Sequence, residues 1–121
     1  MTRHPHAVAS RTTLSSAREL MGEHKIHHLP AIDHDRLVGI LNDQDLQAIH
    51  TPEDHVADAM TVDVATVPEA TPLDEVVTLM DARKLSSVVV MGGTGVAGIF
   101  TLTDAMRAFC NVLEREEAGQ R

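Results

Sequence analysis

Two carboxylates stand out because each follows a polar residue at the same spacing. Thr101 lies three residues before Asp104, Asn42 lies three residues before Asp45, and Thr103 adds a second hydroxyl beside Asp104. One carboxylate can accept hydrogen bonds from two adjacent hydroxyls, such as those of a ribose. Nearby hydroxyls and the N–H groups of a helix start can hold a phosphate. The spacing is also that of a capping box, in which these side chains satisfy only the helix's own N–H groups. Both interpretations stay open at this point.

Histidine and cysteine offer weaker candidates for chemistry. The eight histidines include the spacings His4-Pro5-His6 and His24-x-x-His27-His28, which could place two imidazoles on one metal ion. With one cysteine in the chain, no Cys/His framework completes a tetrahedral set, so we predict no metal site. Cys110 stands beside Phe109 in an apolar helical pattern, which favours a packed thiol over a nucleophile. No serine has a base placed beside it by spacing, and we therefore expect a protein that is not an enzyme.

Composition limits the class of protein and its partners. The 121 residues carry a net charge of -8, which repels phosphate backbones. The chain contains neither Trp nor Tyr, on which bases could stack. Nucleic acid is therefore not an expected partner. No apolar run approaches the roughly 20 residues that a membrane-spanning helix needs. One thiol and no apolar signal core predict a protein of the reducing cytoplasm, without membrane attachment.

The elements that position these side chains occur twice. An offset of 59 residues, set by Met21 and Met80, superimposes the two halves without a gap. The matched residues include Met1-Thr2 with Met60-Thr61, Val8 with Val67, Lys25 with Lys84, Gly39-Ile40 with Gly98-Ile99, and Asp45 with Asp104. We therefore predict two similar units, residues 1–50 and 60–121, joined by a linker and short lead-in helix at 51–59.

Each unit reads as a short strand, a helix, two strands and a second helix. Apolar residues at three- and four-residue steps predict the first helices, and short Val- and Ile-rich runs around turn residues predict strand hairpins. Helices are predicted at 14–23, at 56–60 and from 72, with further helices that begin near 44 and near 101–104. Strands are predicted at 26–32, 37–41, 85–91 and 96–100. We expect Thr71 to cap the second copy's helix, with Pro72 at its first position.

These repeated motifs resemble a known family, the tandem cystathionine-beta-synthase (CBS) domains, whose pairs form Bateman modules. The resemblance rests on Met60-Thr61, on His28-Leu29-Pro30-Ala31-Ile32-Asp33 and on the ending Gly98-Ile99-Phe100-Thr101-Leu102-Thr103-Asp104. The first copy has Asn42 where the family prefers Thr or Ser. The resemblance implies an α+β fold of two pseudo-symmetric CBS repeats packed through their sheets.

The resemblance also implies two ligand clefts, each built from both repeats. The first would be formed by Asp104, Thr101, Thr103, Thr2, Ala7, Ile26, His27 and Ser87. The second would be formed by Asp45, Asn42, Thr61, Thr66, Leu85, Ser86 and His28. Related nucleotide-binding modules often carry Arg or Lys at the position of Ser87. Its replacement by serine favours adenosine, AMP or an adenosyl compound over a polyphosphate.

The implied function is regulatory. Such a pair would sense an adenosine-containing ligand, of the AMP, ADP, ATP, S-adenosylmethionine or NAD type, with no required cofactor. The resemblance further implies a homodimer formed through helices, and an effector protein whose identity is open. The residues considered for a dimer seam are Leu14, Ala17, Leu20, Met21, Leu73, Val76, Val77 and Met80. Two alternatives are a dimeric protein-interaction adaptor with vestigial nucleotide clefts, and a histidine-based metal sensor.

Overall fold

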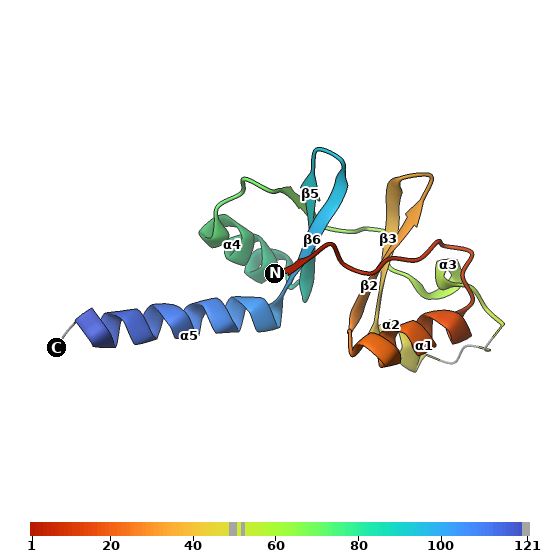
Figure 1. Cartoon of the computed structure of the whole chain (residues 1–121), viewed down its shortest axis with the longest axis horizontal. Coiled ribbons are helices and arrows are strands. Elements are labelled where there is room, and N and C mark those ends of the chain that lie inside the picture. The colour runs from red at the N-terminus through yellow and green to blue at the C-terminus, as the bar shows by residue number, and fades with distance from the viewer. Residues whose placement is uncertain (49–50, 52, 120–121) are drawn as a thin grey trace.

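Two α+β repeats lie side by side, and one long helix extends from the second (Figure 1). The computed structural model describes residues 1–48, 51 and 53–119. The first repeat contains β1 (Thr2–Arg3), α1 (Leu14–His24), β2 (His28–Asp33), β3 (Arg36–Asn42) and α2 (Asp43–Gln47). The second follows α3 (Val56–Ala59) with β4 (Thr66–Pro68), α4 (Leu73–Arg83), β5 (Ser87–Gly92), β6 (Gly95–Thr101) and α5 (Leu102–Gly119). The predicted division at residue 50, and Pro52 of the linker, lie outside the described residues.

The two sheets share one plan at the 59-residue offset. The second repeat's sheet has the order β1-β6-β5-β4, and the first repeat has the hairpin β2-β3. In the first repeat, single bridges replace the two outer strands: Val8 pairs with Ala31 and Thr61 pairs with Ile40. Both hairpins also change register at equivalent places, after Ala31 and after Val90. The predicted pseudo-symmetry is therefore present in the strand pairing itself.

Each repeat sends its leading segment to the sheet of the other repeat. Thr2 pairs with Ile99 of β6, while Thr61 exchanges backbone hydrogen bonds with Ile40 of β3. The crossing segments lie against Gly98 and Gly39. A Cβ on Gly98 would lie 2.7 Å from the Thr2 carbonyl oxygen, and one on Gly39 would lie 2.5 Å from the Met60 sulfur. These repeated glycines make room for the crossing segments.

The first helices of the two repeats end in the same way but begin differently. The N–H groups of Lys25 and Lys84 bind the last carbonyls of α1 and α4 from left-handed conformations, with φ of 54° and 56°. Thr13 caps α1 by accepting a hydrogen bond from the Ser16 N–H. The expectation for α4 was wrong: Pro72 is itself the N-cap, and α4 begins at Leu73. The proline stands where the first repeat has Thr13, so α4 has no side-chain cap bond.

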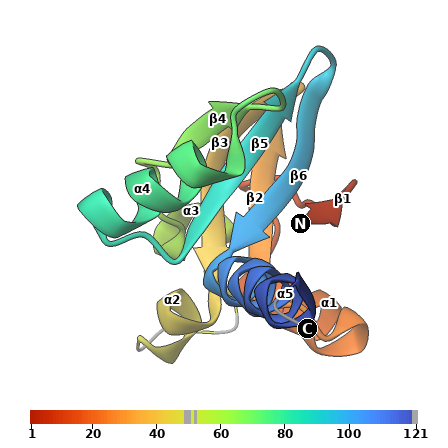
Figure 2. The ribbon, with the colours of Figure 1, turned by 90° about the vertical axis from the view of Figure 1, so that its left-hand side faces the viewer.

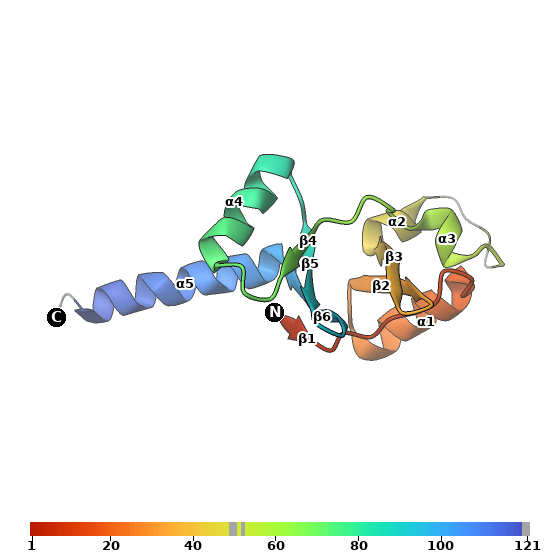
Figure 3. The ribbon, with the colours of Figure 1, turned by 90° about the horizontal axis from the view of Figure 1, so that it is seen from above.

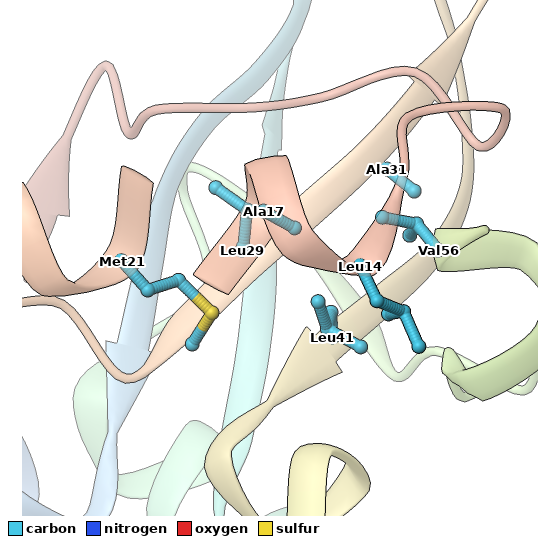
Figure 4. Close-up of a cluster of buried hydrophobic side chains, with 7 residues drawn as sticks. All are labelled: Leu14, Ala17, Met21, Leu29, Ala31, Leu41 and Val56. Atoms are coloured by element: carbon cyan, nitrogen blue, oxygen red, sulfur yellow. The ribbon is translucent and has the colours of Figure 1, made fainter. Parts of the chain in front are cut away.

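Apolar residues form a cluster in each repeat and a third between the sheets. Figure 4 shows the first cluster, where α1, β2, β3 and α3 contribute Leu14, Ala17, Met21, Leu29, Ala31, Leu41 and Val56. The third cluster joins Ile40 of one sheet to Val89 and Ile99 of the other. Burial of these side chains holds the two sheets together, as the resemblance implied.

The burial of the helices changes the candidates for a dimer seam. Leu14, Ala17, Met21, Val76 and Met80 are buried within the chain and are unavailable to a partner. Leu73 and Val77 of α4 are exposed. Helix α5 leaves Cys110 exposed, so the expectation of a packed thiol was wrong. The same helix has exposed apolar residues that were not among the seam candidates: Leu102, Met106, Phe109, Val112 and Leu113. Within the part of the chain that the structure describes, no helix is long and apolar enough to cross a membrane.

Candidate functional site

A cleft of about 640 Å³ lies where the two repeats meet. Its walls come from the N-terminal segment, from the residues just before and at the start of β2, and from the turn between β6 and α5. Figure 3 shows why these parts meet: the N-terminal segment runs from β1, beside β6, across to the first repeat. Val8 then fixes this segment to β2, since its N–H donates to the Pro30 carbonyl and its carbonyl accepts from the Ile32 N–H.

Most residues predicted for the Asp104 cleft lie together in it. The cleft is lined by six of them: Thr2, Ile26, His27, Thr101, Thr103 and Asp104. Ala7 and Ser87 are not among its lining residues; Ala7 precedes the Val8 bridge, and Ser87 pairs with Thr101 across β5 and β6. His28 and Ser86, which the family resemblance assigned to the second cleft, line this one.

The Asp104 carboxylate serves the helix and faces the cleft. Its Oδ2 accepts hydrogen bonds from the Thr101 N–H at 2.9 Å and the Thr101 hydroxyl at 3.2 Å, and the Asp104 N–H donates to the Thr101 Oγ1 at 3.3 Å. The capping box is thus formed. The second oxygen, Oδ1, lies 3.8 Å from the nitrogen of Met1. Capping through one oxygen leaves the other with lone pairs to offer a ligand hydroxyl, so the two interpretations of this motif are compatible.

The first repeat has a matching capping box at Asn42 and Asp45. The Asn42 N–H donates to the Asp45 carboxylate and the Asp45 N–H donates to the Asn42 side-chain oxygen, both at 2.9 Å. His28 is paired with Asn42 across β2 and β3. Thr61 bridges to Ile40, two residues before Asn42.

The remaining predicted residues of the second cleft belong to the second repeat. Thr66 begins β4 opposite Val89, and the Leu85 N–H donates to the Met80 carbonyl. The Ser86 carbonyl accepts from the Leu102 N–H, as the His27 carbonyl does from the Asp43 N–H in the first repeat. Thr66 therefore belongs to the β4–β5 strand pair of the second repeat, and Leu85 belongs to the hydrogen bonds that end α4.

Basic side chains surround the Asp104 cleft, although the chain as a whole is acidic. Its lining residues include Arg3, Lys25 and Arg107, which the sequence analysis did not select, together with the imidazoles of His4, His6, His27 and His28. Asp104 is the one acidic residue among those lining the cleft. The local charge is therefore opposite in sign to the chain's net -8.

Burial lowers the pKa of His28 below its ordinary value. Desolvation is the largest cause and the charge of His27 acts in the same direction, whereas Asp43, Asp104 and Asp45 favour the protonated form. Desolvation outweighs the three carboxylates, so the pKa of His28 stays below its ordinary value and the side chain is mainly neutral near pH 7. Its neighbour His27 is exposed and forms an ion pair with Asp43 through Nδ1 when protonated.

The histidines near the cleft do not form a recognisable metal site. The rings of His6 and His24 stack with their centroids 3.9 Å apart. Among the described residues, no group of three or more His, Cys, Asp or Glu side chains is arranged to hold a metal ion. Stacking accounts for the proximity of this histidine pair without a metal.

Curated relatives contain a stretch similar to this chain within a longer protein. Inosine-5'-monophosphate dehydrogenase of Thermoplasma acidophilum is 29% identical over 100 residues, which are 82% of this chain and 20% of the enzyme. The chain thus spans about a fifth of the length of the curated relatives that it matches.

Solved structures of similar size share the whole fold. AcuB from Vibrio cholerae is 31% identical, with a TM-score of 0.84 and coverage of 98% of this chain and 92% of that one. The CBS domain pair of protein MJ0100, in complex with 5'-methylthioadenosine and S-adenosyl-L-methionine, is 31% identical, with a TM-score of 0.82 and 92% of each chain covered. CBSX2 in complex with AMP is 29% identical, with a TM-score of 0.80 and 93% of each chain covered.

The family assignment rests on sequence and fold together. The sequence model of the CBS domain matches residues 1–49 and again residues 56–111, one match for each repeat. The crossing strands, the repeated glycines and the two capping boxes occupy equivalent places in both matched regions. The chain belongs to the CBS domain family, as a tandem pair of CBS domains.

Proposed function

We propose that this CBS pair is a regulatory module that binds an adenosine-containing ligand in the Asp104 cleft. The observation that carries the proposal is the position of Asp104, at the start of α5 and on the wall of a cleft between the repeats. A ribose would donate its hydroxyls to the Asp104 carboxylate. Relatives that carry AMP or S-adenosyl-L-methionine in their structures support this class of ligand.

The ligand would act by favouring one arrangement of the two repeats. The cleft walls come from both repeats, so a bound molecule would hold them together more firmly than the empty cleft does. An effector protein would then respond to the shifted population, without any bond being made or broken. We further propose that this module is not catalytic, that it is cytoplasmic and that it forms a homodimer.

Replacing Asp104 with asparagine tests the site. Asn keeps the size of the side chain and an oxygen for the cap, but loses the charge that strengthens hydrogen bonds to a ribose. We expect AMP affinity, measured by calorimetry, to fall by about tenfold or more, since a hydrogen bond to a charged group contributes roughly 1.5–3 kcal/mol. Discrimination between AMP and 2'-deoxy-AMP should shrink in the same variant.

Asp58→Asn is the matched control for this test. Asp58 accepts a hydrogen bond from the His55 N–H in the capping box of α3, and it is not among the lining residues of the Asp104 cleft. This variant should bind AMP as the wild type does. Equal AMP affinity in Asp104→Asn and the wild type would show that Asp104 does not read the ribose.

The exposed apolar residues of α5 favour a second candidate, a dimeric adaptor whose clefts are vestigial. Met106 and Phe109 expose 69% and 63% of their surface. Such side chains are typical of surfaces that other proteins cover. A chain that binds neither AMP nor adenosine but self-associates through α5 would support the adaptor over the sensor.

A further inference from the structure

The charges of the Asp104 cleft match an anionic ligand better than a neutral one. Arg3 comes from β1, Lys25 from the end of α1, and Arg107 from α5, so three separate segments bring a fixed positive charge to one cleft. The phosphate group of a nucleotide carries close to two negative charges at pH 7. Clustered cations in a concave wall attract such a group more strongly than isolated surface charges do.

The equivalent positions in the other half show that the fold does not require the charges of Arg3 and Arg107. At the 59-residue offset, Arg3 corresponds to Val62, Arg107 to Ala48, and His4 to Asp63. His27 and His28 correspond to Ser86 and Ser87. Lys25 is matched by Lys84, so its charge belongs to both halves. Because the two halves have the same strand pairing, the other basic residues around Asp104 are a property of that cleft and not of the repeat.

His28 is placed to respond to the ligand's charge. It begins β2 and lines the cleft, with Asp43 and Asp45 of α2 and Asp104 of α5 facing it as charged neighbours. His27 lies beside it, and the other charged or titratable residues of the wall are Arg3, His4, His6, Lys25 and Arg107. His28 is half-buried, so its protonation depends on which charges its surroundings supply.

We propose that the Asp104 cleft binds the phosphorylated form of its adenosine-containing ligand, and that His28 takes up a proton as the phosphate enters. The inference rests on the proposed function, since it assigns a charge and a proton to that same ligand. Arg3, Lys25 and Arg107 supply charge at any physiological pH. His28 adds a charge that exists only in the complex.

The direction of the pH dependence follows from the two states of His28. In the free protein burial holds the pKa of His28 below its ordinary value, whereas an adjacent phosphate favours the imidazolium and raises that pKa in the complex. Between the two pKa values, binding takes up a proton. Affinity therefore rises as the pH falls through the pKa of the complex and stops rising below that of the free protein.

The test is a calorimetric titration of wild type and His28→Asn with AMP and with adenosine, between about pH 6 and pH 8, where imidazole and phosphate both titrate. Paired buffers of different ionisation enthalpy give the number of protons taken up. Protons that the AMP phosphate itself binds or releases contribute equally in both proteins, so they cancel in the difference between wild type and His28→Asn. We expect more proton uptake in the wild type with AMP, and a wild-type advantage that grows toward low pH by no more than about tenfold per pH unit. Adenosine should show no such difference.

His34→Asn is the matched control, because His34 lies in the turn between β2 and β3, outside the residues lining the cleft, with a φ of 48° that Asn tolerates. It should behave as the wild type does. Should His28→Asn fail to fold, the imidazole resonances of wild-type His28 give its pKa with and without AMP by NMR. A pKa that does not rise, or equal proton uptake in wild type and His28→Asn, overturns the inference alone. Failure of both AMP and adenosine to bind overturns the proposed function and, with it, the inference.

Discussion

At the scale of single residues, Lys84 holds an unfavourable backbone conformation. It ends α4 with a φ of 56°, where a residue with a Cβ costs roughly 1–2 kcal/mol and glycine costs little. Lys84→Gly should therefore raise the free energy of unfolding, by about 0.5–1 kcal/mol after the added entropy of the unfolded chain. Urea denaturation would measure it, with Lys84→Ala as the control that removes the same ammonium without relieving the backbone. A Gly variant no more stable than the Ala variant would contradict this account.

Lys25→Gly should relieve the same backbone conformation at the end of α1 and should also weaken AMP binding, because Lys25 lines the cleft.

At the scale of elements, the pairing of β1 with β6 depends on Gly98. A methyl group there would lie 2.7 Å from the Thr2 carbonyl and 2.8 Å from the Met1 sulfur, so β1 would have to move. Gly98→Ala should cost about 1–3 kcal/mol of stability, as overpacking commonly does, and should weaken AMP binding because Thr2 and Arg3 line the cleft. Thermal unfolding and calorimetry would measure the two effects. Gly93→Ala is the matched control, since a Cβ on Gly93 meets nothing within 4 Å. Similar losses in both variants would exclude the crossing strand as the cause.

At the scale of the whole molecule, α5 extends from the second repeat with an apolar side uncovered; Figure 2 views it nearly end-on. Leu102, Met106, Phe109 and Leu113 follow steps of four, three and four residues, which places them on one face. We expect wild-type chains to pair through this face. Phe109→Glu should weaken the dimer by at least about tenfold with little effect on the fold, because desolvating a charge at an apolar contact is costly. Sedimentation analysis would measure the change, with Val62→Glu as the control because Val62 is 72% exposed and lies outside α5. A monomeric wild type, or an unchanged dimer in Phe109→Glu, would contradict this expectation.

Repetition made the fold predictable from the sequence. The matched glycines, the paired Met-Thr segments and the capping residues repeat at one offset, and each corresponds to a feature of strand pairing or helix start. The exchange of leading segments between the repeats was not predicted from local patterns, because pairing partners far apart in sequence leave no local signal. The start of α4 was predicted one residue too early, because proline is common at the first helical position, whereas Pro72 is the N-cap that precedes it.

The same reliance on repetition explains what was missed in the candidate site. Arg3 and Arg107 have no basic counterpart in the other half, so a search for matched residues passes over them. Asp104 and Thr101 were selected because Asp45 and Asn42 mirror them. Residues that distinguish one cleft from the other are by nature those that do not repeat, and they become visible only when the chain's separate segments are placed in space.

The exchanged leading segments have a consequence for how such a chain could arise. A single repeat on its own would have a segment with no sheet to join, and a glycine-lined edge with no segment to cover it. Two separate copies could each place their leading segment on the sheet of the other. Within this chain, the pairing of Thr2 with Ile99 and of Thr61 with Ile40 does the same between the two repeats. Joining the copies end to end makes this exchange of segments an intramolecular contact. Each half can then take on different charged residues without losing the exchange.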